Sequence, residues 1–162
     1  MFGLTSLGII HTVISLIAVG AGIVGFLRDR RVDLDTGAGK IYLWTTVATC
    51  ITGFGVFQHG GFGKPHALGV LTLLLLGAAW TLRGRVVPQT VLLSTTFFFH
   101  LIPAMTETLT RLPLGAPLLK DAEAPELKAI TGILFLLLVI GVTLQVRWLK
   151  QVGRTPGQRA AV

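Results

Sequence analysis

The sequence predicts an all-α polytopic membrane protein with five transmembrane helices, and three observations support this fold class. The hydrophobic content is 52%, only 13% of the residues are charged, and the mean hydropathy is +0.76, which is typical of a membrane protein. Five apolar segments approach the ~20 residues that a helix needs to cross a bilayer. Lys and Arg also gather in alternate gaps between these segments, as they do on the cytoplasmic side of membrane proteins.

The five predicted spans follow one another with short connections. They form a single transmembrane domain over residues 1–152, and we expect a disordered cytoplasmic tail at 153–162. The first span is not a cleavable signal peptide, because Met1–Thr5 carries no positive charge and the apolar run is too long. The spans are Leu4–Leu27, Ile41–Phe57, Pro65–Leu82, Val87–Thr108 and Leu127–Leu149.

The first four spans each carry a stripe of small or polar residues at helical spacing, and each stripe contains a histidine. Small residues let helices pack closely in lipid. The fifth span differs, because Ile130–Val142 is almost wholly Leu, Ile, Val, Phe and Gly and has no ionisable residue. We therefore expect a four-helix, histidine-bearing core with one peripheral helix.

The positive charges predict the orientation of the chain. The gaps after the first, third and fifth spans hold ten of the fourteen Lys and Arg residues against three acidic residues, whereas the other gaps hold four of each sign. By the positive-inside rule the amino terminus is outside and the carboxyl terminus is cytoplasmic. The ten residues are Arg28, Arg30, Arg31, Lys40, Arg83, Arg85, Arg147, Lys150, Arg154 and Arg159.

The pI of about 10.6 would suggest nucleic-acid binding in a soluble domain. Here the cations form short clusters beside the spans, so anionic lipid headgroups on the cytoplasmic side explain them better, and we expect no nucleic-acid partner. Cys50 is the only cysteine and lies within the second span, which excludes a disulfide framework.

The four histidines are the candidate chemistry of the chain. His59 and His66 flank a glycine-rich outer hairpin, whereas His11 and His100 lie deeper, ~10 and ~12 Å below the outer ends of their spans at helical rise. Ionisable residues within a membrane usually face the bundle interior and mark a functional site.

One hypothesis is a haem b site. His11 and His100 lie at matched depth on different spans, so they could ligate the iron from its two faces, with Arg111 near a propionate. Such a protein would pass electrons from a quinol, bound at a quinone site, to an acceptor on the outer side. Four glycines beside the ligands could make room for the macrocycle: Gly22, Gly25, Gly55 and Gly69.

Three alternatives stay open, and so does the question whether the chain is an enzyme. His59, His66 and Glu107 could bind Zn²⁺ or Cu²⁺. The histidines could handle protons, although the inner half offers only hydroxyl partners. They could also make only hydrogen bonds, in a non-enzymatic accessory subunit or scaffold. A partner membrane subunit would then dock on the fifth span and on the outer segment Leu112–Glu126.

Several short motifs lie between about Leu7 and Pro113: Gly39-Lys40-Ile41-Tyr42, Pro65-His66, His100-Leu-Ile-Pro with Glu107, and Arg111-Leu-Pro. In these motifs the sequence resembles a bacterial family of predicted multi-span membrane proteins of unknown function. The resemblance implies a bacterial inner (plasma) membrane and a common site for His66, His100, Glu107 and Arg111, and it implies no known activity. A looser likeness to small transmembrane b-type cytochromes rests on the histidine-bearing bundle alone.

Overall fold

The computed structural model describes residues 6–55, 63–113 and 115–153. All regular secondary structure in this part of the chain is helical, so the predicted all-α class is confirmed. Each predicted span overlaps one helix, and the ends differ by up to four residues. The hairpin residue His59 and most of the expected tail lie outside the described residues. The helices are α1 (Ser6–Asp29), α2 (Gly37–Gly53), α3 (Lys64–Thr81), α4 (Val86–Arg111) and α5 (Pro125–Val152).

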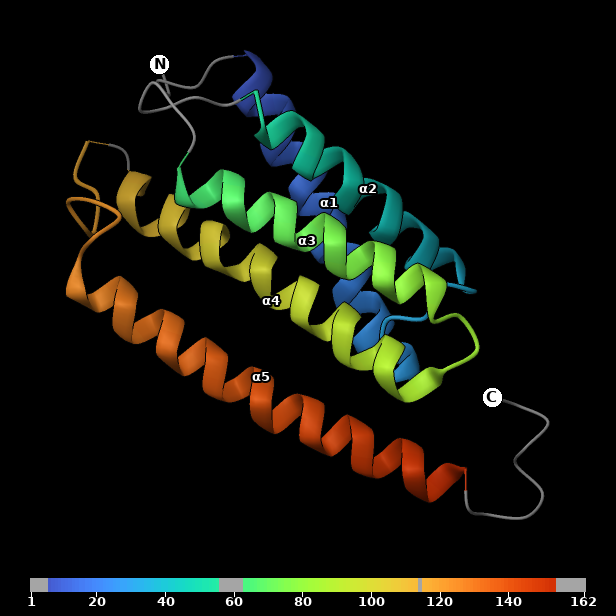
Figure 1. The fold of residues 1–162 in the computed structure, drawn as a ribbon. Coiled ribbons are helices and arrows are strands. Elements are labelled where there is room, and N and C mark those ends of the chain that lie inside the picture. Colours follow the sequence, from blue (N-terminus) through green and yellow to red (C-terminus); the bar gives the residue numbers. More distant parts are fainter. Residues whose placement is uncertain (1–5, 56–62, 114, 154–162) are drawn as a thin grey trace.

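Helices α1 to α4 form an up-down-up-down bundle (Figure 1). Helix α1 packs most extensively against α2, α2 contacts α3, α3 contacts α4, and α4 returns to contact α1. Helices α2 and α4 are therefore diagonal to one another and run in the same direction. Among the helices, α5 packs against α4 alone and lies along the outside of the bundle (Figure 1).

Local side chains determine where the helices begin. The Thr36 hydroxyl accepts a hydrogen bond from the Gly39 amide at 3.1 Å and donates one to the Asp33 carbonyl at 2.8 Å, so Thr36 caps α2. At the start of α3, the Gly63 amide donates to Nδ1 of His66 at 3.1 Å. These contacts satisfy amide groups that a helix start otherwise leaves without partners.

Gly22 is a point of close packing between α1, α2 and α4. A Cβ added at Gly22 would come within 2.6 Å of the Phe97 ring and 3.3 Å of the Tyr42 ring. Gly22 thus lets α1 approach two large aromatic side chains closely. The buried apolar cluster of the bundle comes from the α1–α2 connection and from α2, α3 and α4, and consists of Val32, Leu34, Tyr42, Leu43, Leu76, Ala79 and Leu93.

The outer surface of the bundle is strongly apolar. Long aliphatic side chains are exposed along α1 and α5, and a patch of this extent favours contact with lipid rather than water. By length and composition, α1, α4 and α5 are each apolar enough to cross a membrane. Helix α2 has only 17 residues, and α3 carries Lys64 and His66 in its first turn. By the same criteria of length and composition, these two helices are not among those apolar enough to cross a membrane. Three spanning helices indicate a membrane protein.

Candidate functional site

A line of polar side chains crosses the centre of the bundle between the diagonal helices α2 and α4. The Tyr42 hydroxyl lies 2.8 Å from Oγ1 of Thr96, and Nε2 of His100 lies 3.0 Å from Oγ1 of Thr46. All four side chains are buried. We call Tyr42, Thr46, Thr96 and His100 the polar ladder. In each pair the two residues are 54 positions apart in the sequence. The separation is the same because α2 and α4 run in the same direction with one fixed register.

The direction of the first hydrogen bond in the ladder follows from its neighbour. Oγ1 of Thr96 also donates to the Leu93 carbonyl at 2.9 Å. Because a hydroxyl carries only one proton, the Tyr42 hydroxyl must be the donor to Thr96. The Tyr42 ring also packs edge-on against the His100 ring, with centroids 6.0 Å apart. The two pairs of the ladder therefore form one connected unit.

His11 is attached to the same helix by a similar contact. Its Nδ1 lies 3.1 Å from Oγ1 of Thr52, and Thr52 donates its own proton to the Ala48 carbonyl at 2.8 Å. His11 must therefore donate through Nδ1–H. Gly53 provides the space, because a Cβ there would meet Cε1 of His11 at 3.1 Å. Both histidines of the predicted haem site are thus bonded to threonines of α2.

The described packing does not provide the space that a haem would need. The Gly22 position is filled by Phe97 and Tyr42, as described above. The Gly25 position faces the backbone of Arg31 and Val32, the Gly55 position faces Leu7, and the Gly69 position faces Phe54. Nε2 of His100 is engaged by Thr46. The residues present do not fit a haem between His11 and His100 in this arrangement, and the haem hypothesis stays a prediction.

The predicted metal residues are engaged in structural contacts where the structure describes them. Nδ1 of His66 accepts the hydrogen bond that caps α3. Glu107 forms an ion pair with Arg111 one turn later on α4. Arg111, predicted to lie near a haem propionate, is therefore paired with Glu107. Within residues 6–55, 63–113 and 115–153, no group of three or more His, Cys, Asp or Glu side chains could hold a metal ion. A zinc or copper site that includes His59 stays a prediction.

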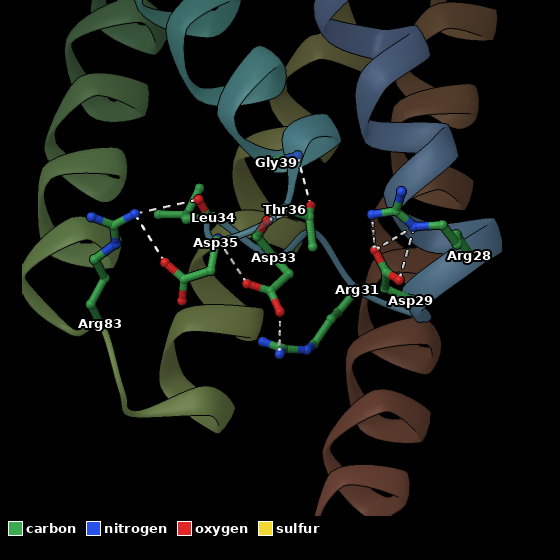
Figure 2. A network of polar contacts seen from close by, with 9 residues as sticks. All are labelled: Arg28, Asp29, Arg31, Asp33, Leu34, Asp35, Thr36, Gly39 and Arg83. Atoms are coloured by element: carbon green, nitrogen blue, oxygen red, sulfur yellow. Dashed lines mark hydrogen bonds and ion pairs between the residues drawn. The ribbon is translucent and has the colours of Figure 1, made fainter. Parts of the chain in front are cut away.

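A second polar cluster holds the opposite end of the bundle together (Figure 2). Nη2 of Arg31 lies 2.5 Å from a carboxylate oxygen of Asp33, and the other Asp33 oxygen accepts from the Asp35 amide at 3.0 Å. From the α3–α4 connection, Arg83 donates to Asp35 at 3.1 Å and to the Leu34 carbonyl at 3.4 Å. We call Arg31, Asp33, Asp35, Thr36 and Arg83 the loop network.

Helix α5 is connected to this same end. Gln145 donates to the Arg30 carbonyl at 2.8 Å and accepts from the Ser94 hydroxyl at 2.8 Å. The Arg30 guanidinium lies 5.3 Å from the centroid of the Trp148 ring, a distance at which a cation and an aromatic face attract each other. Gln145 thus joins α5 to both α4 and the α1–α2 connection.

Sequence reasoning missed both polar clusters as units. Asp33 and Asp35 belong to the three acidic residues of the charge count, and Thr46 is one of the hydroxyl residues of the inner half. A signal for the ladder was nevertheless present, because Tyr42 and Thr46 are four residues apart on one helix face, as are Thr96 and His100.

The two ends of the bundle differ in how their charges are balanced. At the histidine end, Lys64 and Lys128 lie 2.7 and 3.5 Å from Glu123, and Glu107 pairs with Arg111. The hydrogen bond from Lys64 lowers the pKa of the Glu123 carboxyl. At the loop-network end, four exposed cations have neither an acidic nor an aromatic partner among the described residues: Lys40, Arg85, Arg147 and Lys150.

No family model matches the chain, and no curated protein and no solved structure matches it either. The resemblance to a bacterial family of membrane proteins of unknown function therefore stays a prediction, as does the common site that it implies.

Proposed function

We propose that this protein is a non-enzymatic accessory subunit or scaffold of a bacterial inner membrane, in which the histidines hold the bundle together. The observation that carries the proposal is the bonding of both predicted haem ligands to α2. His11 bonds to Thr52 and His100 to Thr46. A buried polar group must have a hydrogen-bond partner, and these threonines provide one. The histidines thus connect α1 and α4 to α2 without a bound cofactor.

The position of α2 and α3 supports five spans rather than three. These two helices complete the ring that α1 and α4 begin, so a bilayer crossed by α1 and α4 would enclose them as well. The 17 residues of α2 correspond to roughly 26 Å at ~1.5 Å per residue, close to the ~30 Å thickness of the hydrocarbon layer. Local thinning of the bilayer or a longer neighbouring helix can accommodate so small a mismatch.

The unpaired cations support the orientation with the amino terminus outside. Lys40, Arg85, Arg147 and Lys150 lie at the loop-network end, where the carboxyl end of α5 also lies. An excess of Lys and Arg marks the cytoplasmic side of a membrane protein. The histidine end, where the described basic residues except Lys120 have acidic partners, would then face outward.

Helix α5 is the surface on which a partner membrane subunit would dock. It contacts one helix of the bundle, and only Leu127 and Leu149, near its two ends, are buried. Between them the residues Ile133, Leu136 and Leu137 are more than half exposed, at 59, 58 and 58%. In lipid, such a face can pack against a second apolar helix by van der Waals contact.

A haem-b redox role, with a quinol as electron donor, remains the second candidate. The observation that favours it is that His11 and His100, on α1 and α4, both bond to threonines of the same helix, α2. In that case His11 and His100 would hold the iron, and Arg111 would leave Glu107 for a propionate. The bundle would have to open at Gly22 and break the bond between Thr46 and His100.

A visible spectrum and a metal analysis of the detergent-purified protein distinguish these roles. The scaffold proposal expects no α band, no shift of a Soret band between oxidised and reduced samples, and no stoichiometric zinc or copper. A stoichiometric haem spectrum that is lost in both His11→Ala and His100→Ala would contradict it and support the redox role. Stoichiometric zinc or copper that is lost in His59→Ala would instead support the outer metal site.

A further inference from the structure

An apolar groove runs between α2 and α3 on the outside of the bundle. Its volume is about 240 Å³. The groove exists because α2 and α3 pack less extensively than α1 and α2, and because Gly77 has no side chain to fill it: a Cβ there would meet no atom within 4 Å. Its walls are Leu43, Trp44, Val47, Leu73, Leu76, Gly77 and Trp80.

One end of the groove carries aromatic and basic side chains. Trp44 and Trp80 are 65 and 45% exposed. Trp80 lies at the loop-network end of α3, whereas Trp44 is the eighth of the 17 residues of α2. The Arg83 guanidinium lies 4.1 Å from the centroid of the Trp80 ring. Lys40 precedes Trp44 by one helical turn, is exposed, and has no acidic partner among the described residues. A tryptophan at the end of a helix, such as Trp80, is typical of the boundary between the hydrocarbon layer and the headgroups.

We propose that this groove binds the acyl chain of an anionic phospholipid whose phosphate is held by Lys40 and Arg83. The inference rests on the membrane embedding proposed above. Asp35 balances Arg83 at 3.1 Å, so Lys40 leaves the mouth of the groove with a net positive charge. A guanidinium and an ammonium are both common phosphate ligands. The charge therefore selects an anionic headgroup, and the apolar walls select the chain attached to it.

The charge at the mouth of the groove favours a lipid over a helix of a partner protein. A lipid carries a phosphate next to its acyl chains, so a single molecule can meet both the apolar walls and the cations Lys40 and Arg83. An apolar helix would fill the walls and leave Lys40 without an anionic partner.

Native mass spectrometry of the delipidated, detergent-solubilised protein tests the proposal. Phosphatidylglycerol and phosphatidylcholine are added in turn at equal concentrations. We expect one phosphatidylglycerol to bind at least fivefold more tightly than phosphatidylcholine. Gly77→Phe fills the groove and should lower phosphatidylglycerol binding at least fivefold. Lys40→Gln should remove the preference for the anionic lipid. Equal binding of the two lipids by the unaltered protein would overturn the proposal.

Two matched variants control for surface changes elsewhere. Gly141→Phe adds the same side chain to α5 at a position where a Cβ also meets no atom within 4 Å, and Lys120→Gln removes a charge at the histidine end. Both should bind phosphatidylglycerol as the unaltered protein does. If Gly141→Phe weakens binding as much as Gly77→Phe, the groove is not the site. If Gly77→Phe instead abolishes association with a second protein and leaves lipid binding intact, the occupant is a helix.

The failure of this inference can be separated from failure of the membrane proposal. Alkaline carbonate extraction of cell membranes asks whether the chain is embedded, independently of any bound lipid. Retention in the membrane together with equal binding of the two lipids would overturn only the lipid site. Release from the membrane would overturn both proposals.

Discussion

The two ends of this bundle contain similar numbers of acidic residues but use them differently. At the loop-network end, Asp33 and Asp35 form ion pairs with Arg31 and Arg83, and Asp33 also accepts a hydrogen bond within the α1–α2 connection. Several cations at this end have no acidic partner among the described residues. At the histidine end, Glu123 and Glu107 form exposed or half-exposed ion pairs with Lys64, Lys128 and Arg111. The difference indicates that one end is built by specific packing and the other is held by charges in contact with solvent.

The largest loss of folding stability is expected on substitution of Gly39, at the loop-network end. A Cβ at this position would collide with the carbonyl group of Asp33, which is backbone and cannot move aside cheaply. We expect Gly39→Ala to lower the free energy of unfolding by about 3 kcal/mol or more, as overpacking against a fixed group does.

Gly37→Ala is the matched control, because Gly37 lies in the same helical turn and a Cβ there meets no atom within 4 Å. It should be neutral or stabilising by up to about 1 kcal/mol, through the better helix propensity of alanine. Thermal unfolding of both variants in the same detergent measures the difference. Equal stability of the two would show that the loop network is not rigidly packed.

Substitution in the polar ladder, which lies between the two ends, should cause the next largest loss of folding stability. His100→Ala leaves a cavity and removes the partner of the buried Thr46 hydroxyl, so we expect a loss of about 2–4 kcal/mol. The double variant Thr46→Val with His100→Ala should lose less than the sum of the two single variants, because the pair acts together. Additive losses in the melting curves would contradict the ladder.

A smaller effect is expected at Arg83. Its ion pair with Asp35 is substantially exposed, at 36 and 77% of the two side chains, so solvent screens it. We expect Arg83→Gln to cost about 0.5–1 kcal/mol. Lys150→Gln, at an exposed cation of the same end with no acidic partner, should not change the melting temperature. The effect at Arg83 should also shrink in high salt, and an effect independent of salt would argue against the ion pair.

The smallest loss of folding stability is expected at the histidine end, and the size of this loss should depend on pH. The Lys64 hydrogen bond lowers the pKa of Glu123 from its ordinary value of 4.5. A carboxyl whose folded pKa is depressed stabilises the protein above the unfolded pKa, and this contribution disappears as the pH falls through the folded value. Glu123→Gln should therefore remove a small, acid-sensitive part of the stability. If melting curves of the variant and the unaltered protein differ equally at pH 3 and pH 7, this assignment is wrong.

The positions of the helices could be predicted from the sequence, whereas the contacts between them could not. Each apolar run became one helix, because length and hydropathy are local properties. The pairing of Tyr42 with Thr96 depends on α2 and α4 being diagonal, and on their register, neither of which appears in any single segment. For the same reason Gly22, expected to make room for a haem, is instead packed by Phe97.

The fixed separation of 54 residues in both rungs of the ladder also restricts how the bundle can move. If α4 slid along α2 by one turn, ~5.4 Å, Tyr42 would meet either His100 or Leu92, and Thr46 would meet Ala104 or Thr96. Either step breaks both buried hydrogen bonds of the ladder and leaves one of its polar side chains opposite Leu92 or Ala104. The ladder therefore opposes sliding of α4 along α2, whereas tilting or rotation of the other helices leaves its two pairs intact.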